Sequence, residues 1–200
     1  PQRSYSLRRL HQFNVRRPSR LLQEQFDPSD QIEDELINLN SNRKLLDSVS
    51  DSISHQSGAP TLWDSGYTGK GVRVAVFDTG LAIDHPHFRK IRDRSNWTDE
   101  PTLDDGLGHG TFVAGVIAGN GAECPGFAPD AELFIFRVFN QRQLSFTSWF
   151  LDAFNAAIKT RVNVLNLSIG GPDFNDRPFV DKVLEMSSNG IIIVSAIGND

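Results

Sequence analysis

The sequence predicts an α/β domain with a mostly parallel sheet flanked by helices on both faces, preceded by a charged N-terminal segment. Strand-like and helix-like stretches alternate from about residue 58 onward, which is typical of parallel sheets with crossover helices. The strand-like runs are continuously apolar, as in strands buried on both faces. Blocks of one charge sign occupy residues 1–35. We therefore divide the chain into a segment 1–57 and a domain 58–200.

Four apolar, β-rich runs are the predicted strands. They read VRVAVF at 72–77, LFIFRVF at 133–139, VNVLNLS at 162–168 and GIIIVSA at 190–196. Two helices are expected between the later strands. In the first, apolar residues recur at helical spacing from Phe150 to Ile158. The second runs from Pro178 to Met186, with proline in its first turn, and is closed by Gly190.

The N-terminal segment separates its charges into two blocks. Residues 1–22 carry six arginines and no acid, whereas residues 24–35 carry six acids and no base. Such blocks are usually solvated. We therefore expect residues 1–57 to be largely disordered.

The composition excludes several classes of protein. A net charge of −5 argues against a nucleic-acid-binding protein, because such proteins need clustered basic residues facing phosphate. The longest apolar runs are far shorter than the roughly 20 residues that span a bilayer. Cys124 is the only cysteine, so no disulfide can form within the chain. The absence of an initiator Met and of a leader indicates a piece of a longer precursor.

Two residues with acid–base chemistry lie where a parallel sheet collects its functional groups. Asp78 ends the run VAVFDTG, at the carboxyl edge of the sheet. His109 opens the helix that continues through TFVAGVIAG, where the helix N-terminus favours the neutral imidazole that a base needs. Gly108 and Gly110 allow backbone and substrate to come close. A carboxylate can hold one ring N–H and leave the other nitrogen free to take a proton from a hydroxyl, so we interpret Asp78 and His109 as an acid–base pair.

The stretches VAVFDTG, GHGTFVAG and SAIGND occur in the order and approximate spacing of the subtilisin-like serine proteases, and residues 58–200 resemble this family. The resemblance implies a subtilisin-like fold, of which the chain holds the N-terminal part, and a serine endopeptidase activity. It also implies that residues 1–57 are the end of a propeptide and a linker. Longer stretches such as CPGFAPDAELFIFRVF and VLNLSIGGPDF resemble a membrane-anchored branch of the family that processes secretory-pathway precursors.

The resemblance assigns roles to individual residues. It implies that Asp78 orients the base, that His109 is the general base and acid, and that the amide of Asn199 helps to hold the oxyanion. The strand edge along which subtilases pair the substrate backbone is matched by Ser168, Ile169, Gly170 and Gly171.

The family's nucleophilic serine lies in a GTSxAxP stretch, which these 200 residues do not contain. Ser57 precedes the first core strand, and Ser195 sits inside an apolar strand, so neither is assigned as the nucleophile. We expect the 200 residues alone to be inert and the parent protein to be an active enzyme.

Processing and modification sites follow from short motifs. The resembled branch prefers an arginine four residues before the cut and an aliphatic residue two before it, and RRLH at 8–11 and RLLQ at 20–23 match. The N-terminal segment is therefore expected to be cut by the enzyme itself after His11, Gln23 or both.

Asn96 begins the sequon NWT and is an expected glycosylation site on a surface loop.

The resemblance also implies partners and a location. The expected partners are membrane-bound precursor proteins and the protein's own propeptide, in the lumen of the endoplasmic reticulum or Golgi, with an anchor outside these residues. Calcium is common in the family, but no ligand set can be closed from the sequence, and no organic cofactor is expected. Nucleic acid is not an expected partner.

Two alternatives remain open. A DSG at Asp64 and the DTG at Asp78 resemble the paired acids of aspartic proteases, but only 14 positions (78 − 64) separate them, too few for two lobes. The second alternative is a non-catalytic relative, or an inert fragment, that acts as a binding protein.

Overall fold

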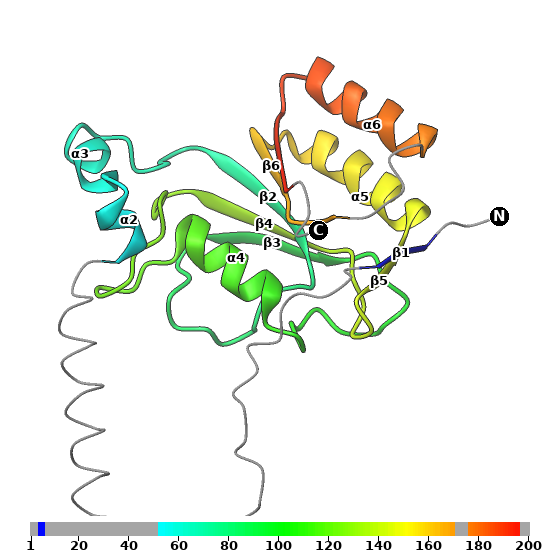
Figure 1. The fold of residues 1–200 in the computed structure, drawn as a ribbon, viewed down its shortest axis with the longest axis horizontal. Coiled ribbons are helices and arrows are strands. Elements are labelled where there is room, and N and C mark those ends of the chain that lie inside the picture. The colour runs from blue at the N-terminus through cyan, green and yellow to red at the C-terminus, as the bar shows by residue number, and fades with distance from the viewer. Residues whose placement is uncertain (1–3, 7–51, 171–175, 197–200) are drawn as a thin grey trace, which may run out of the picture.

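A computed structural model describes residues 4–6, 52–170 and 176–196 of the chain (Figure 1). Its centre is a five-stranded sheet in which every pair of neighbours is parallel, in the order β3-β4-β2-β6-β7. The strands are β2 (Arg73–Asp78), β3 (Ile91–Asn96), β4 (Glu132–Arg137), β6 (Val164–Leu167) and β7 (Ile192–Ser195). The predicted fold class is confirmed.

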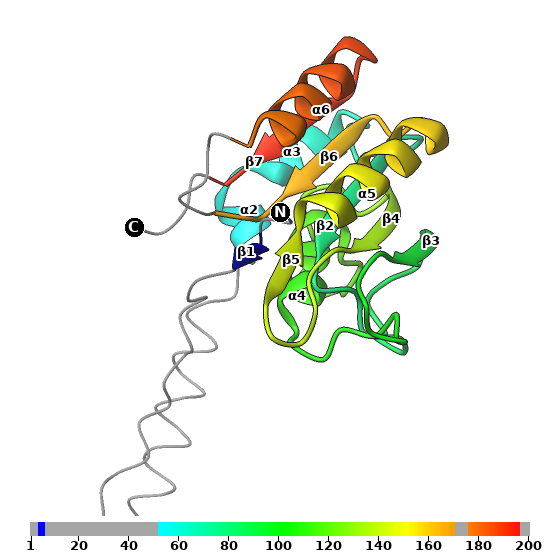
Figure 2. The same ribbon diagram turned by 90° about the vertical axis from the view of Figure 1, so that its right-hand side faces the viewer.

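Helices cover both faces of the sheet (Figures 1 and 2). Helix α4 (His109–Ala118) lies on one face, and α5 (Thr147–Thr160) and α6 (Arg177–Ser188) lie together on the other. Two short helices, α2 (Ile53–Gln56) and α3 (Ala59–Asp64), lie at one end of the molecule. Within the described part of the chain, no helix is long and apolar enough to cross a membrane.

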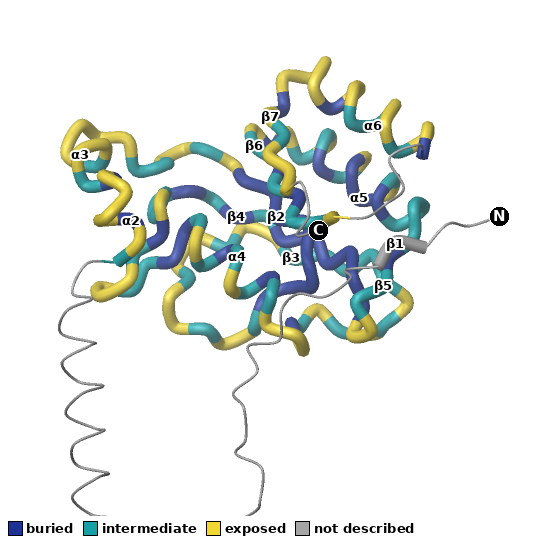
Figure 3. The backbone as a smooth tube through the Cα atoms, viewed as in Figure 1, coloured by how far each residue is buried: buried dark blue, intermediate teal, exposed yellow. Residues whose placement is uncertain are grey.

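Two hydrophobic clusters hold the layers together (Figure 3). Between the sheet and α5 and α6, the rings of Phe77, Phe150 and Phe154 contact one another. On the opposite face, α4 places its small residues Ala114 and Ala118 against the sheet. Because alanines protrude little, the start of α4 can approach the end of β2 closely.

Three strands were not predicted, namely β1, β3 and β5. The edge strand β3 has the sequence IRDRSN and exposes Arg92 and Asp93, so it lacks the apolar run used to find the others. The strand β5 (Leu144–Phe146) is only three residues long. It pairs antiparallel with the equally short β1 (Ser4–Ser6), which lies in the N-terminal segment.

The domain boundary at residue 57 stays a prediction. Ser54 lies before it, is buried, and donates a hydrogen bond of 2.8 Å to the carbonyl of Pro125. Trp63 follows the boundary and donates from its indole to the carbonyl of Phe127 at 2.9 Å. Residues on both sides of position 57 therefore pack on the domain.

Candidate active site

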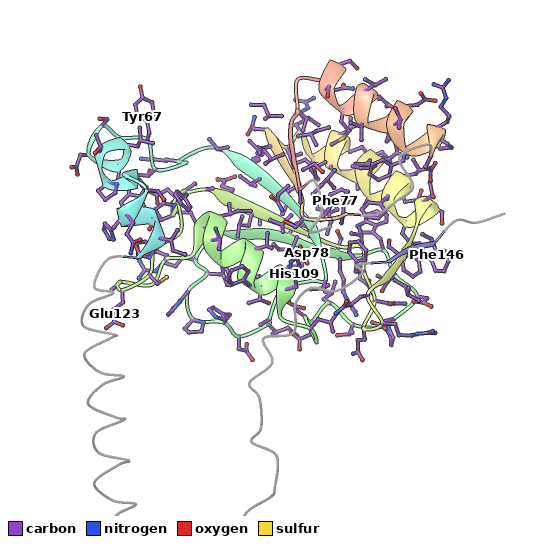
Figure 4. The ribbon with its side chains drawn as sticks, viewed as in Figure 1. Tyr67, Phe77, Asp78, His109, Glu123 and Phe146 are labelled. Carbon is purple, nitrogen blue, oxygen red and sulfur yellow. The ribbon has the colours of Figure 1, made fainter. Side chains whose placement is uncertain are left out.

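The end of β2 and the start of α4 bring Asp78 and His109 together. The two labelled side chains meet beside the carboxyl edge of the sheet (Figure 4). Asp78 Oδ1 lies 2.6 Å from His109 Nδ1, and the Asp78 side chain is only 1% exposed. β2 is the central strand, between β4 and β6, so the pair occupies the middle of the edge where parallel sheets place their sites.

The hydrogen bonds of the pair fix one tautomer of the imidazole. An ionised carboxylate can only accept hydrogen bonds, so Nδ1 of His109 carries the ring proton and donates a hydrogen bond to Asp78. The same oxygen accepts the backbone N–H of Thr79 at 2.8 Å. Within the described residues, Nε2 of His109 has no hydrogen-bond partner, and the side chain is 17% exposed. The lone pair of Nε2 is therefore available to a substrate or a nucleophile.

Glycines permit this close approach of helix and strand. A Cβ on Gly110 would lie 2.3 Å from the carbonyl oxygen of Gly80, so no side chain fits there. Gly108 precedes the helix with a φ of 84°, in the left-handed region that glycine adopts without strain. A larger residue at position 110 would push the start of α4 away from β2, whereas at position 108 it would strain the backbone without meeting a neighbouring atom.

The charges around His109 favour the protonated imidazole. Burial opposes charging of the ring, but the hydrogen bond and the negative charge of Asp78, with the charge of Asp105, outweigh it. The pKa of His109 therefore lies above its ordinary value of 6.5. The sequence-based expectation that the helix N-terminus would keep the ring neutral is wrong in direction, because two carboxylates face the ring.

We expect an NMR titration of His109 to show an imidazole midpoint above 6.5. Because the folded pKa is raised, the stabilisation from this group is fully present below the unfolded pKa and is lost as pH rises through the folded pKa. The resonance is assigned by its loss in His109→Gln. A midpoint at or below 6.5 would show that the carboxylates do not control the ring.

The proposed substrate-binding residues lie at the same edge of the sheet. Ser168, Ile169 and Gly170 follow β6, the strand next to β2. The hydroxyl of Ser168 accepts the side-chain amide of Asn166 at 2.8 Å. Four other predicted site residues lie outside the described residues, namely Gly171, Asn199, His11 and Gln23.

Asn96 is the last residue of β3 and is half-buried, whereas the sequence analysis expected it on a surface loop. Its Oδ1 accepts the backbone N–H of Thr98 at 3.0 Å and the hydroxyl of Thr98 at 2.7 Å. Its amide donates to the carbonyl of Glu100. In the folded domain, this amide therefore holds the turn after β3. Its glycosylation stays a prediction.

The described residues hold no cluster of the side chains that most often bind metal ions. Among them, no group of three or more His, Cys, Asp or Glu side chains is close enough to hold an ion. His85 and His87 lie with ring centroids 5.2 Å apart, without a third ligand of this kind. No role is derived for calcium in this part of the chain.

One buried acid beside the pair was not recognised as part of the site. Asp105 lies four residues before His109, is 9% exposed, and accepts backbone N–H groups at the start of α4. From the sequence alone, Asp104 and Asp105 could be a loop pair or part of a negative pocket for a basic substrate residue, and neither interpretation makes Asp105 a support of the acid–base pair. An acid just before a helix N-terminus is favourable for the helix dipole, and this signal could have identified it.

These features define a class of protein. It is a parallel α/β domain with a hydrogen-bonded Asp–His pair at the carboxyl end of its central strand. Such a pair is suited to acid–base chemistry on a hydroxyl group. The sequence profile described as the subtilase family matches residues 69–200. The chain belongs to the subtilase family.

The chain is similar in sequence to several named proteases. The chain is 64% identical to the membrane-bound transcription factor site-1 protease of Homo sapiens over 160 residues, which cover 80% of the chain and 15% of that protein. It is 61% identical to the subtilisin-like protease SBT6.1 of Arabidopsis thaliana over 81% of the chain and 16% of that protein. Subtilisin E of Bacillus subtilis is 36% identical over 72% of the chain and 39% of that protein. The chain thus spans about 15% of the length of the site-1 protease.

Proposed function

We propose that the protein containing this chain is a subtilisin-like serine endopeptidase, in which His109 is the general base and acid and Asp78 orients it. The observation that carries this proposal is the 2.6 Å contact between Asp78 Oδ1 and His109 Nδ1, which leaves Nε2 without a partner among the described residues. Membership of the subtilase family supports it, because the relatives named above are proteases.

In the proposed reaction, a serine of the whole protein attacks the carbonyl carbon of the scissile peptide bond. His109 takes the hydroxyl proton on Nε2 as the new C–O bond forms, and Asp78 stabilises the resulting imidazolium. The side-chain amide of Asn199 donates to the oxyanion. His109 then gives its proton to the leaving amine when the C–N bond breaks, and water hydrolyses the acyl-enzyme by the same steps.

The proposed substrates are secretory-pathway precursor proteins, including membrane-bound ones, cut after Arg-x-aliphatic-x sequences. Support comes from the 64% identity to a protein named a membrane-bound transcription factor site-1 protease. The substrate backbone is proposed to pair beside residues 168–171, at the edge of the sheet that carries Asp78. A luminal location and an anchor outside this chain belong to the same proposal.

Self-processing is part of the proposed function. The segment 1–57 is proposed to be the end of the propeptide and a linker, cut after His11, Gln23 or both. The antiparallel pairing of β1 with β5 supports a docked N-terminal segment, since it joins residues 4–6 to the domain. This pairing lies at β5 and not at residues 168–171, the edge that is matched to pairing with the substrate backbone.

N-terminal sequencing of the mature protein tests the proposed function. We expect new termini at Gln12 or Glu24 in the wild-type protein, and their loss when the active-site serine or His109 is replaced by alanine. Termini that persist in both variants would show that another protease makes the cut. A wild-type protein that cleaves neither itself nor an Arg-x-Leu-x peptide would favour the binding-protein alternative.

A further inference from the structure

A buried carboxylate that the proposed mechanism does not use lies beside the acid–base pair. Asp105 Oδ1 accepts the hydroxyl of Thr79 at 2.8 Å and the backbone N–H groups of Leu107 and Gly108 at 3.2 and 2.8 Å. Its Oδ2 accepts the backbone N–H and the hydroxyl of Thr111 at 2.8 and 2.7 Å. Both oxygens are thus occupied by donors from the protein.

These donors join the end of β2 to the start of α4. Thr79 directly follows Asp78, and its hydroxyl oxygen also accepts the N–H of Gly110 at 2.9 Å. Thr111 lies in the first turn of the helix that His109 opens, and its hydroxyl accepts the N–H of Ala82 at 2.9 Å. Asp105 therefore holds the residue after Asp78 and residues on both sides of His109 without touching either member of the pair.

Asp105 is charged in this setting although it has no cationic partner among the described residues. Burial works to raise the pKa of its carboxyl group, but the hydrogen bonds from Thr111, Thr79 and Gly108 outweigh burial and hold this pKa below its ordinary value. The N-terminus of α4 favours the negative charge further. Because both oxygens of Asp105 already accept hydrogen bonds from the protein, neither is open to a positively charged group of a substrate.

We infer that Asp105 is a positioning residue, which sets the separation and orientation of Asp78 and His109 by bridging β2 and α4 through Thr79, Gly108 and Thr111. This inference rests on the proposed endopeptidase function. Asp105 also adds a second negative charge near the imidazole. The charged groups that act on His109 are thus Asp78, at the end of β2, and Asp105, in the loop before α4.

The test is Asp105→Asn in the full-length protein. In this variant, the side-chain NH2 would face a backbone N–H whichever way the amide is turned, because backbone N–H groups donate to both oxygens of Asp105. A backbone N–H cannot accept a hydrogen bond, so part of the bridge would be lost. We expect kcat to fall about tenfold to hundredfold from the misplaced base, with KM within about twofold of the wild-type value because no substrate contact is lost. The NMR midpoint of His109 should also fall, since a negative charge near the ring is removed.

The matched control is Asp104→Asn, which removes the same charge one residue away. Asp104 accepts the N–H of Ile83 at 3.1 Å and does not join the bridge. In case Asp105→Asn does not fold, Thr79→Val removes the bridging hydroxyl and keeps the charge. It should lower kcat, and Thr79→Ser should restore most of it.

The outcomes separate this inference from the proposed function. An inactive wild-type protein would overturn the proposed function, and the His109 midpoint in Thr79→Val would still test the bridge, because this variant keeps both carboxylates and changes the midpoint only if the ring moves relative to them. An active wild-type protein with kcat and the His109 midpoint unchanged in both Asp105→Asn and Thr79→Val would overturn the positioning role.

Discussion

Replacing Asp78 with asparagine is expected to lower kcat by about 10⁴-fold, the magnitude known for the same change in one well-characterised serine protease triad. Asp78 accepts the Nδ1 proton of His109 at 2.6 Å. An asparagine amide can instead donate to Nδ1, which moves the ring proton to Nε2. The nitrogen that must accept the serine proton is then blocked.

Asp64→Asn is the matched control for this measurement. Asp64 is the exposed last residue of α3 and supplies the other acid of the aspartic-protease alternative. The account expects kcat of Asp64→Asn to equal that of the wild-type protein. Equal and large losses in both variants would support the aspartic-protease alternative, and undiminished cleavage by Asp78→Asn would remove Asp78 from the mechanism.

Replacing Asn199 with alanine is expected to raise the barrier by roughly 2.7 to 4 kcal/mol, a loss of about 10² to 10³ in kcat, at nearly constant KM. This magnitude is the one known for the oxyanion-hole asparagine of subtilisin, a member of the same family. The amide is proposed to donate to an oxyanion that exists only after the attack, so its loss should leave substrate binding almost unchanged.

Steady-state kinetics with a peptide substrate separate this role from binding. Asn189→Ala provides the control, because Asn189 directly follows α6 as its C-cap and its amide donates to the carbonyl of Glu185 in that helix. A change confined to KM in Asn199→Ala would make Asn199 a ground-state binding group.

The parts of the fold that could be predicted are those where burial alone selects the residues. The strand β2 is buried along five of its six residues, and its continuous apolar run is the sequence signal of a central parallel strand. The edge strand β3 carries an arginine and an aspartate, Arg92 and Asp93, on its exposed positions, and edge strands use such charges to avoid further pairing. Its residues therefore give no apolar pattern to recognise.

The same contrast holds at the site. Asp78 and His109 could be predicted as a pair because a strand end and a helix start meet at one edge of a parallel sheet. The role of Asp105 depends on where backbone N–H groups converge in space, and residue spacing does not report this. The raised pKa of His109 likewise depends on two carboxylates near the ring and not on the helix alone.

The central claim is that Asp78 and His109 activate a serine of the whole protein. The most direct measurement is the rate at which a fluorophosphonate probe labels full-length protein, with the labelled residue located by mass spectrometry. The account predicts a single labelled serine in the wild-type protein and a large loss of labelling rate in Asp78→Asn and His109→Ala. Labelling at the wild-type rate in both variants, or no labelling of folded wild-type protein, would contradict it.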